Sequence, residues 1–325
     1  MTEFTARIAG IGSYLPERIL TNEEMSSMVD TSDSWIRERT GIRQRHIAPD
    51  GVTTADLAEQ ACRRALDDAG LTAEDVDLIV VATTTPDFTF PSVGTMLQAR
   101  LGATKGAAFD VQAVCTGFVY ALSVADNMIA RGQAETALVV GAETMSRILD
   151  WTDRSTCVLF GDGAGAMVLT AGEPAGTEGA DGVLATYLRS DGRFKDLLHV
   201  DGGPSSTGTV GHLRMIGNQV FRHAVTNIAE SMTTIAGRAG VSIEEVDWFV
   251  PHQANQRILE GVARKLSIPT EKVISTVADH GNTSAASVPL AFDRAVQDGR
   301  IKRGDLVLME ALGGGFTWGA VLARF

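Results

Sequence analysis

Residues 63–81 read RRALDDAGLTAEDVDLIVV, and residues 233–250 read TTIAGRAGVSIEEVDWFV. The two stretches share an Ala-Gly and a Val-Asp dipeptide at a constant offset of about 170 residues. In each, an amphipathic helix pattern ends near a glycine, and a short acidic turn leads into an apolar run typical of a buried strand. The same structural unit therefore occurs twice, which indicates a duplicated fold.

Further pairs of segments match in the same order downstream of this unit. Each half alternates helix patterns with short apolar strands, and this alternation predicts an α/β fold whose strands are covered on both faces. Duplication of such a half gives a molecule with pseudo-two-fold symmetry and equivalent positions near its centre. The matched pairs are 78–85 with 248–253, 107–115 with 273–282, and 136–143 with 305–311.

The repeat also predicts the boundaries of the two halves. We expect an N-terminal half over residues 1–170 and a C-terminal half over residues 171–325. The stretch from about 171 to 217 is rich in glycine, and this composition predicts the loops that connect the halves.

The composition excludes several classes of protein. The chain has 325 residues and 44% hydrophobic content, but no run of about 18 apolar residues that would span a bilayer. Its formal net charge of −12 argues against nucleic acid or an anionic membrane as a partner. Because 3 cysteines are too few for a disulfide framework and the N-terminal residues lack a secretory pattern, we expect a cytoplasmic protein.

Cys115 lies in the stretch DVQAVCTGFVYAL (residues 110–122), between a predicted strand and a predicted helix. The free N–H groups and the positive dipole end of a helix stabilise a thiolate, which favours a reactive cysteine. An apolar environment raises the pKa of a thiol, which favours a structural cysteine. The local sequence leaves both interpretations open. Cys62, on an apolar helix stripe, and Cys157, in a strand-like run, fit the structural interpretation.

Two polar residues and a glycine-rich loop occupy comparable positions. His252 follows an apolar strand at the end where ligands of α/β sheets gather, although a lone histidine is often only a structural hydrogen-bonding group. Asn282 lies near the repeat position of Cys115, and its alternative role is an ordinary helix N-cap. Residues 311–319 (ALGGGFTWG) form either a tight turn or a set of N–H donors. Together these groups would supply the nucleophile, the proton handling and the oxyanion donors of thiol catalysis.

Six motifs resemble those of the thiolase superfamily, and specifically the β-ketoacyl-acyl carrier protein synthase III enzymes that initiate fatty acid synthesis. The resemblance covers essentially the whole chain. Thiolases carry a second cysteine near the C-terminal glycines, and the corresponding stretch ALGGGF has none. The motifs are DSWIRERTGIRQRHI (33–47), VCTGF (114–118), GDGAGA (161–166), VPHQANQRI (250–258), HGNTSAASVP (280–289) and EALGGGFTWG (310–319).

This resemblance implies a five-layered αβαβα fold, a homodimer and an acyltransferase that uses no cofactor or metal. Cys115 would be the nucleophile that takes an acyl group from acyl-CoA. His252 and Asn282 would bind the thioester carbonyl of malonyl-acyl carrier protein, with a neutral His252 donating from Nε2. The backbone N–H groups of Cys115 and Gly314 would form the oxyanion hole. Acyl transfer followed by condensation at one thiol implies ping-pong kinetics.

The resemblance also implies residues that receive the acyl-CoA. Trp35 and Arg154 match positions that hold the CoA adenine between a ring and a guanidinium group, and Arg39 matches a position near the CoA phosphates. The remaining matches line the pantetheine tunnel, and they are Gly217, Phe221 and Asn255.

The acyl carrier protein is acidic, and so is this chain overall. Binding between them therefore needs a local basic surface, and we hypothesise one on the predicted helix that follows His252 together with Arg222, which follows Phe221. The residues of this carrier-protein surface are Gln253, Ala254, Asn255, Gln256, Arg257, Arg222, Arg264 and Lys265.

Primer choice and pathway leave alternatives. Residues 86–93 (PDFTFPSV) resemble a loop that reaches across the dimer to close the acyl pocket, and the bulky Phe90 favours a short straight primer such as acetyl-CoA. A relative that primes polyketide synthesis or selects another alkyl group is a close alternative. A thioester hydrolase would need neither Asn282 nor a carrier-protein surface. A silent synthase partner is disfavoured because Cys115, His252 and Asn282 are all present.

Overall fold

The computed structural model describes residues 4–174, 179 and 181–325. The helices are α1 (Asn22–Met28), α2 (Asp33–Thr40), α3 (Thr54–Ala69), α4 (Val93–Leu101), α5 (Gly117–Ala130), α6 (Gly217–Ala239), α7 (Gln256–Leu266), α8 (Val277–His280) and α9 (Ser287–Gln297). Short 3-10 helices are η1 (Ala73–Asp75), η2 (Val114–Thr116), η3 (Met145–Ile148), η4 (Gly192–Leu197), η5 (Ile243–Glu245), η6 (Thr270–Lys272) and η7 (Ser284–Ala286).

The strands of the described residues fall into two larger sheets and two short two-stranded sheets, β2-β3 and β9-β10. They are β1 (Phe4–Tyr14), β2 (Ile19–Thr21), β3 (Gln44–His46), β4 (Leu78–Ala82), β5 (Ala107–Val111), β6 (Thr136–Thr144), β7 (Asp162–Pro174), β8 (Gly182–Ser190), β9 (Leu198–Val200), β10 (Leu213–Met215), β11 (Trp248–Pro251), β12 (Leu306–Gly313) and β13 (Thr317–Arg324).

The two larger sheets repeat one topology. The first has the strand order β1-β7-β6-β4-β5, and the second has the order β8-β13-β12-β11 when read in the same direction. In the first sheet, β4 pairs in parallel with β6, which pairs antiparallel with β7. In the second, β11 pairs in parallel with β12, which pairs antiparallel with β13. The counterpart of β5 is reduced to a parallel bridge between Phe249 and Val273. This repetition agrees with the duplicated α/β fold predicted from the sequence.

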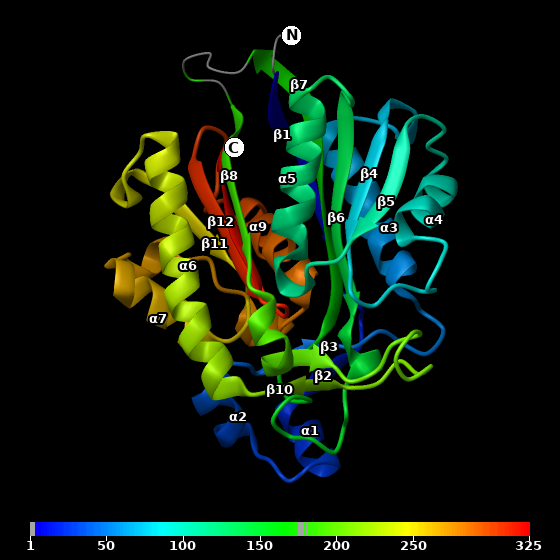
Figure 1. Cartoon of the computed structure of the whole chain (residues 1–325), viewed down its shortest axis with the longest axis vertical. Coiled ribbons are helices and arrows are strands. Elements are labelled where there is room, and N and C mark those ends of the chain that lie inside the picture. The colour runs from blue at the N-terminus through cyan, green and yellow to red at the C-terminus, as the bar shows by residue number, and fades with distance from the viewer. Residues whose placement is uncertain (1–3, 175–178, 180) are drawn as a thin grey trace.

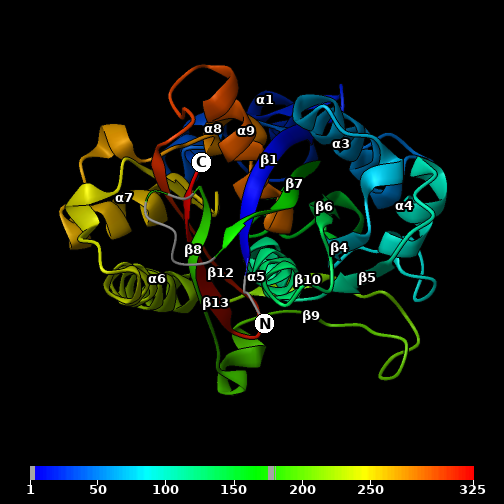
Figure 2. The same cartoon turned by 90° about the horizontal axis from the view of Figure 1, so that it is seen from above.

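The helices and sheets form five layers (Figures 1 and 2). Helices α5 and α9 lie between the two sheets, where one apolar cluster includes Val80 of β4, Phe118 of α5, Val250 of β11 and Phe292 of α9. Helices α3 and α4 cover the outer face of the first sheet. Helices α6 and α7 cover the outer face of the second. Because both faces of each sheet are covered, the central strands are apolar on both sides, as their sequences predict.

The helix ends in the repeated unit follow the predicted chemistry. Helix α3 begins with a capping box, in which the side chains of Thr53 and Asp56 each accept the backbone N–H of the other residue. It ends at Gly70, with φ of 65°, and α6 ends at Gly240, with φ of 72°. Glycine suits both positions because this left-handed conformation strains other residues. The two glycines of the repeat therefore end equivalent helices.

The segment predicted to connect the halves differs in part from the expectation. Strand β7 continues past residue 170 to Pro174, so the predicted boundary falls inside a strand of the first sheet. Strand β8, predicted as loop, pairs with β13 at the edge of the second sheet. The sequence of β8 gave a weak signal, because an edge strand buries few of its residues and shows little apolar periodicity. Residues 175–178 and 180 of the predicted connection lie outside the described residues.

Candidate active site

Two similar turns carry the predicted reactive groups into the middle layer. Val114 has φ of 51° and begins η2, which leads into α5; Ser284 has φ of 50° and begins η7, which leads into α9. Positive φ is uncommon outside glycine, so the shared conformation marks these turns as equivalent. The equivalence refines one expectation: the counterpart of Cys115 is Ala285, and Asn282 lies just before the turn.

The Cys115 side chain lies in η2, directly before α5, and is 3% exposed. Burial raises the pKa of its thiol to about 12 and outweighs a pKa-lowering interaction with Ser284. The thiol is therefore protonated in the free protein at neutral pH. Cys62 and Cys157 are fully buried and lie outside the residues that line the described cavity, as expected of structural cysteines.

His252 is held from two sides. Its backbone N–H donates to the carbonyl of Glu310 at 2.8 Å, and its Nδ1 lies 2.7 Å from the hydroxyl of Ser287. Because that hydroxyl accepts the backbone N–H of Gln253 at 3.3 Å, its own hydrogen is free for Nδ1. This network assigns the remaining imidazole hydrogen to Nε2. Burial lowers the pKa of His252 to about 3, so the ring is neutral and Nε2 is a donor.

The carboxamide of Asn282 is oriented by the turn that follows it. Its Oδ1 accepts the backbone N–H of Ser284 at 2.9 Å, which leaves its NH2 group as a donor. Its backbone N–H donates to Leu159, and its backbone carbonyl accepts from Gly161. Asn282 is 5% exposed and lines the same cavity as Cys115 and His252.

The glycine-rich loop approaches Cys115 closely. A Cβ atom on Gly313 would lie 2.6 Å from the backbone N of Cys115, a distance that real Cβ atoms do not show. A Cβ on Gly314 would lie 2.8 Å from the carbonyl of Leu198. The loop therefore needs glycine in order to pack here. The predicted oxyanion role of the Gly314 N–H stays a prediction.

A cavity of about 430 Å³ brings most of the predicted residues together. Apolar side chains that include Leu198, Ile228 and Leu312 contribute to its wall. The predicted site residues that line it are Trp35, Arg39, Cys115, Gly217, Phe221, His252, Ala254, Asn255, Arg257 and Asn282. An apolar cavity with a few converging polar groups is the usual form of an active site.

The predicted adenine site has a different geometry from the expectation. The guanidinium groups of Arg39 and Arg154 lie 4.6 Å and 5.2 Å from the centroid of the Trp35 ring. Arg154 also donates to the backbone carbonyl of Asp30 at 2.8 Å. A base can stack between Trp35 and Arg154 only after this guanidinium group moves away from the ring, because a cation already occupies its face.

The predicted carrier-protein surface needs one correction. Gln253 is 1% exposed, and its carboxamide bonds the backbone of Pro251, Ile274, Thr276 and Val277. It therefore fixes the chain after β11 and cannot contact a carrier protein. Its polar side chain in a motif gave no indication of burial.

The other residues of that surface are accessible. Arg257, Arg264 and Lys265 of α7 and Arg222 of α6 are exposed, while Gln256 is half-buried and bonded to Glu260 and Ser275. Asn255 has a further role that the motif did not indicate, because its side chain caps α7 by accepting the N–H of Ile258.

Three buried residues near the site were not predicted to have a role. Ser287 bonds His252, Ser284 begins the turn beside Cys115, and Glu310 is 2% exposed on β12. The signal for the two serines was their spacing of three residues at the start of an apolar helix, which puts both on one helix face.

Further findings concern membranes and metals. In the part of the chain that the structure describes, no helix has the length and apolar character needed to cross a membrane. Within the same residues, no cluster of His, Cys, Asp and Glu side chains is suited to hold a metal ion. The predicted independence from cofactors stays a prediction.

Comparison with known proteins identifies the family. The family described as 3-oxoacyl-[acyl-carrier-protein (ACP)] synthase III matches residues 109–192, and its C-terminal part matches residues 237–325. The β-ketoacyl-[acyl-carrier-protein] synthase III of Caulobacter vibrioides is 62% identical over 98% of both chains. The enzyme of the same name from Rhodospirillum centenum is 64% identical over 98% of both.

The solved structures agree with the sequence relatives. The crystal structure of 3-oxoacyl-[acyl-carrier-protein] synthase III from Aquifex aeolicus superimposes with a TM-score of 0.92 at 48% identity. The match covers 98% of this chain and 100% of the other. It confirms the thiolase-like fold that the motifs implied. The chain belongs to the β-ketoacyl-[acyl-carrier-protein] synthase III family and is an acyltransferase-type condensing enzyme of fatty acid synthesis.

Proposed function

We propose that this enzyme condenses an acyl-CoA primer, acetyl-CoA in the first instance, with malonyl-acyl carrier protein through an acyl-Cys115 intermediate. The sulfur attacks the primer carbonyl, and the bond to the CoA sulfur breaks. Loss of CO2 from the malonyl group then leaves a carbanion that attacks the acyl carbon and releases Cys115. The products are 3-oxoacyl-acyl carrier protein, CoA and CO2. The observation that carries this proposal is the convergence of Cys115, His252 and Asn282 on one cavity.

The two donors suit the second step. Decarboxylation places negative charge on the thioester oxygen, so the site needs fixed hydrogen-bond donors and no strong base. The Nε2–H of neutral His252 and the NH2 group of Asn282 are such donors, because Ser287 and Ser284 occupy the other polar atoms of the two side chains. Buried donors act strongly because little water competes with them.

The outer end of the cavity suits a nucleotide and an acidic partner. Trp35 offers an aromatic face once the guanidinium group of Arg154 moves away from the ring, and Arg39 and Arg154 offer positive charge for phosphates. The guanidinium carbon of Arg257, an exposed residue of α7, lies 5.9 Å from the ring centroid of Phe221. Both residues line the cavity, so this positive charge lies at the cavity wall. On a chain of net charge −12, this local positive charge supports docking of an acidic carrier protein beside the tunnel.

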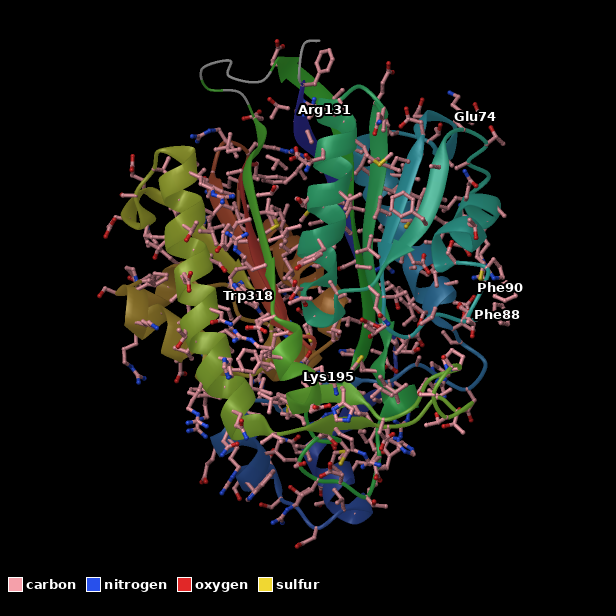
Figure 3. The ribbon with its side chains drawn as sticks, viewed as in Figure 1. Glu74, Phe88, Phe90, Arg131, Lys195 and Trp318 are labelled. Carbon is pink, nitrogen blue, oxygen red and sulfur yellow. The ribbon has the colours of Figure 1, made fainter. Side chains whose placement is uncertain are left out.

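A homodimer is the assembly that the surface supports. Strand β5 is an open edge of the first sheet, and Ala108, Phe109 and Val111 along it are only partly buried. An open apolar edge is a template for pairing with a second chain. Phe88 and Phe90 extend outward near this edge, at 58% and 84% exposure (Figure 3). In a dimer they would find the apolar contact that they lack here.

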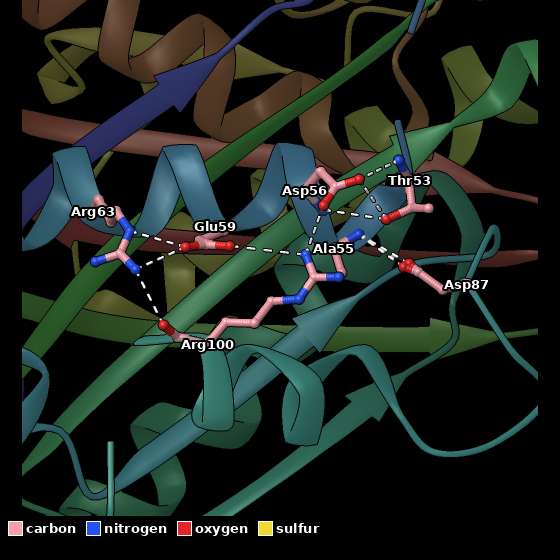
Figure 4. A network of polar contacts seen from close by, with 7 residues as sticks. All are labelled: Thr53, Ala55, Asp56, Glu59, Arg63, Asp87 and Arg100. Carbon is pink, nitrogen blue, oxygen red and sulfur yellow. Dashed lines mark hydrogen bonds and ion pairs between the residues drawn. The ribbon is translucent and has the colours of Figure 1, made fainter. Parts of the chain in front are cut away.

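The loop that carries these phenylalanines is anchored at its base. The backbone N–H of Ala55, in the first turn of α3, donates to the carboxylate of Asp87 (Figure 4). The Ala55 nitrogen lies 3.1 Å from each of the two carboxylate oxygens. The guanidinium group of Arg100 in α4 donates to the carboxylate of Asp56 in α3 at 2.8 Å. These contacts tie the start of the loop and the helix that follows it to α3, with Phe90 exposed between them. This supports its role in closing the acyl pocket of a partner subunit.

The test is a product assay. The protein is incubated with acetyl-CoA and malonyl-acyl carrier protein, and the acyl products and CO2 are quantified over a panel of straight, branched and longer acyl-CoAs. We expect 3-oxoacyl-carrier protein with acetyl-CoA preferred. Free acid without condensation would favour the thioester hydrolase instead. No product and no hydrolysis would favour the silent partner, and a preference for longer or branched primers would favour the specialised relatives.

A further inference from the structure

The reaction begins with a proton that has no evident acceptor. Cys115 must lose its thiol proton before attack, and burial raises the pKa of this thiol to about 12. His252 is a poor acceptor, because its Nδ1 is bonded to Ser287 and burial lowers its pKa to about 3. Formation of a new isolated charge in such a site is costly. An acceptor that already carries a negative charge would avoid that cost.

Ser284 lies beside the thiol and is not satisfied. It is fully buried, its φ is 50°, and its backbone N–H is fixed to Asn282. Its hydroxyl makes no hydrogen bond of regular geometry with any described residue. The turn that Ser284 begins packs against η2, which carries Cys115, and against β6, which carries Glu143. A Cβ on Gly141, two residues before Glu143 in β6, would lie 2.4 Å from the backbone carbonyl oxygen of Ala285 in this turn. In agreement with this packing, the Ser284 hydroxyl lowers the pKa of both Cys115 and Glu143. Ser284 therefore lies on a turn between a proton donor and a possible acceptor.

Glu143 of β6 is fully buried and is surrounded by donors. Its Oε2 accepts from the Thr84 N–H at 3.0 Å, the Thr83 hydroxyl at 3.2 Å and the Thr85 hydroxyl at 2.7 Å. Those two hydroxyls accept the N–H groups of Thr85 and Thr144, which leaves their own hydrogens for Glu143. A carboxyl that meets only donors is solvated as its anion. These donors favour a negative charge next to the thiol. Burial outweighs them and raises the pKa of Glu143, which makes its carboxylate a stronger proton acceptor.

We propose that the Ser284 hydroxyl relays the thiol proton of Cys115 to Glu143 when Cys115 attacks an electrophilic carbon, which in the reaction is the thioester carbon of acyl-CoA. Ser284 gives its hydrogen to the carboxylate and receives the hydrogen of Cys115, so the S–H bond breaks and an O–H bond forms on Glu143. The total charge of the three groups is −1 before and after transfer. When the thiolate attacks, the departing CoA sulfur takes the proton back through Ser284, and the carboxylate is restored. This inference rests on the proposed acyl-Cys115 intermediate.

The first test removes the relay. In single-turnover mixing with acetyl-CoA, Ser284→Ala should load Cys115 about 100-fold more slowly than wild type. The loss should be larger in this step than in condensation once the acyl-enzyme has formed, because condensation releases Cys115 as a thiolate. Thr283→Val is the matched control: it removes a neighbouring hydroxyl that is equally buried and also lacks a partner among the described residues. It should load at the wild-type rate.

The second test gives opposite signs for a relay and for a bystander. The charge of Glu143 raises the pKa of Cys115 by Coulombic repulsion. If Glu143 is only a bystander, its neutralisation in Glu143→Gln should lower the pKa of Cys115 and speed alkylation of this thiol. The relay predicts slower alkylation by iodoacetamide and slower loading, with the pH profile from about pH 6 to about pH 9 displaced to higher pH. Peptide mass distinguishes Cys115 from the other cysteines.

The double variant completes the test. Because both residues act in one path, Ser284→Ala with Glu143→Gln should be no slower than the slower single variant. Multiplied losses, faster alkylation in Glu143→Gln, or normal loading in Ser284→Ala would each overturn the relay. Far-UV circular dichroism and thermal midpoints verify that the variants fold. If wild type itself is not acylated at Cys115, the proposed function fails. If wild type is acylated and the variants load Cys115 at the same rate, the relay alone fails.

Discussion

At the scale of the residue, the surroundings of a side chain decide its chemistry more than its type does. Cys115, His252 and Asn282 could be selected from the sequence because each follows a predicted strand, with Cys115 and Asn282 near corresponding ends of the repeat. The protonation states of Cys115 and His252 could not, since these depend on burial and on hydroxyl partners such as Ser287 that only the fold brings close. Gln253 shows the same limit: it stands in the same motif as His252, yet it is buried as a structural amide.

Replacement of Ser287 by alanine should separate the two steps of the reaction. The variant loses the hydroxyl that fixes the His252 tautomer at 2.7 Å, so the Nε2 donor is no longer assured. We expect condensation to slow about tenfold or more, because the lost hydrogen bond contributes about 1–1.5 kcal/mol and about 1.4 kcal/mol of barrier is tenfold in rate. Loading of Cys115 should be retained. Separate single-turnover assays of the two steps measure this. Equal losses in both steps would contradict the assigned role.

Glu310 should make stability depend on pH. Burial raises its pKa to about 8, so the folded state keeps a proton that the unfolded chain loses above about pH 4.5. The free energy of unfolding should therefore fall between about pH 5 and pH 8, by up to about 1.4 kcal/mol per pH unit from this group. Below the unfolded pKa the contribution is complete. Urea unfolding of wild type and Glu310→Gln measures it, and the decline should be smaller in the variant. Parallel curves would refute the prediction.

At the scale of the element, the close approach of the segment 311–319 to the turn that carries Cys115 explains why this segment is rich in glycine. The repeat allowed us to predict the helices that end at glycine and the apolar strands. It did not reveal β8, because an edge strand carries little periodicity. Nor did it show that the segment 311–319 packs against the turn of the other half, a contact between parts of the chain that are distant in sequence.

A pair of glycine variants tests that contact. Gly313→Ala places a Cβ 2.6 Å from the Cys115 backbone N, so the turn must shift, and loading should fall by at least about tenfold. Gly237→Ala in α6 is the control, because nothing lies within 4 Å of its Cβ. There alanine should stabilise the helix by about 0.5–1 kcal/mol and leave loading unchanged. Normal loading in Gly313→Ala would show that the approach is not tight.

At the scale of the whole molecule, duplication fixes where the site lies. Each half contributes one turn to the middle layer, and the Cys turn of the first half meets the Asn turn and the His strand of the second. The sequence predicts this meeting because the repeat implies a pseudo-two-fold axis. It cannot predict the surroundings of the exposed edge of β5 and of the loop with Phe90, which in the proposed homodimer would depend on a second chain.

Phe90→Ala tests that assembly. Because Phe90 is 84% exposed, its loss should leave the fold of a single chain unchanged. In the proposed dimer it would open the acyl pocket, so the variant should accept longer acyl-CoAs better relative to acetyl-CoA. Light scattering should give twice the chain mass for wild type. A monomeric wild type, or an unchanged primer preference, would contradict the proposed role of this loop.

The measurement that tests the central claim most directly is the mass of the protein after brief mixing with acetyl-CoA alone. The account predicts one added acetyl group per chain, located on Cys115 by peptide mass and absent from Cys115→Ser. Addition of malonyl-acyl carrier protein should then remove it with release of CO2. An acetyl group on another residue, or no covalent adduct in a protein that still forms product, would contradict the acyl-Cys115 mechanism.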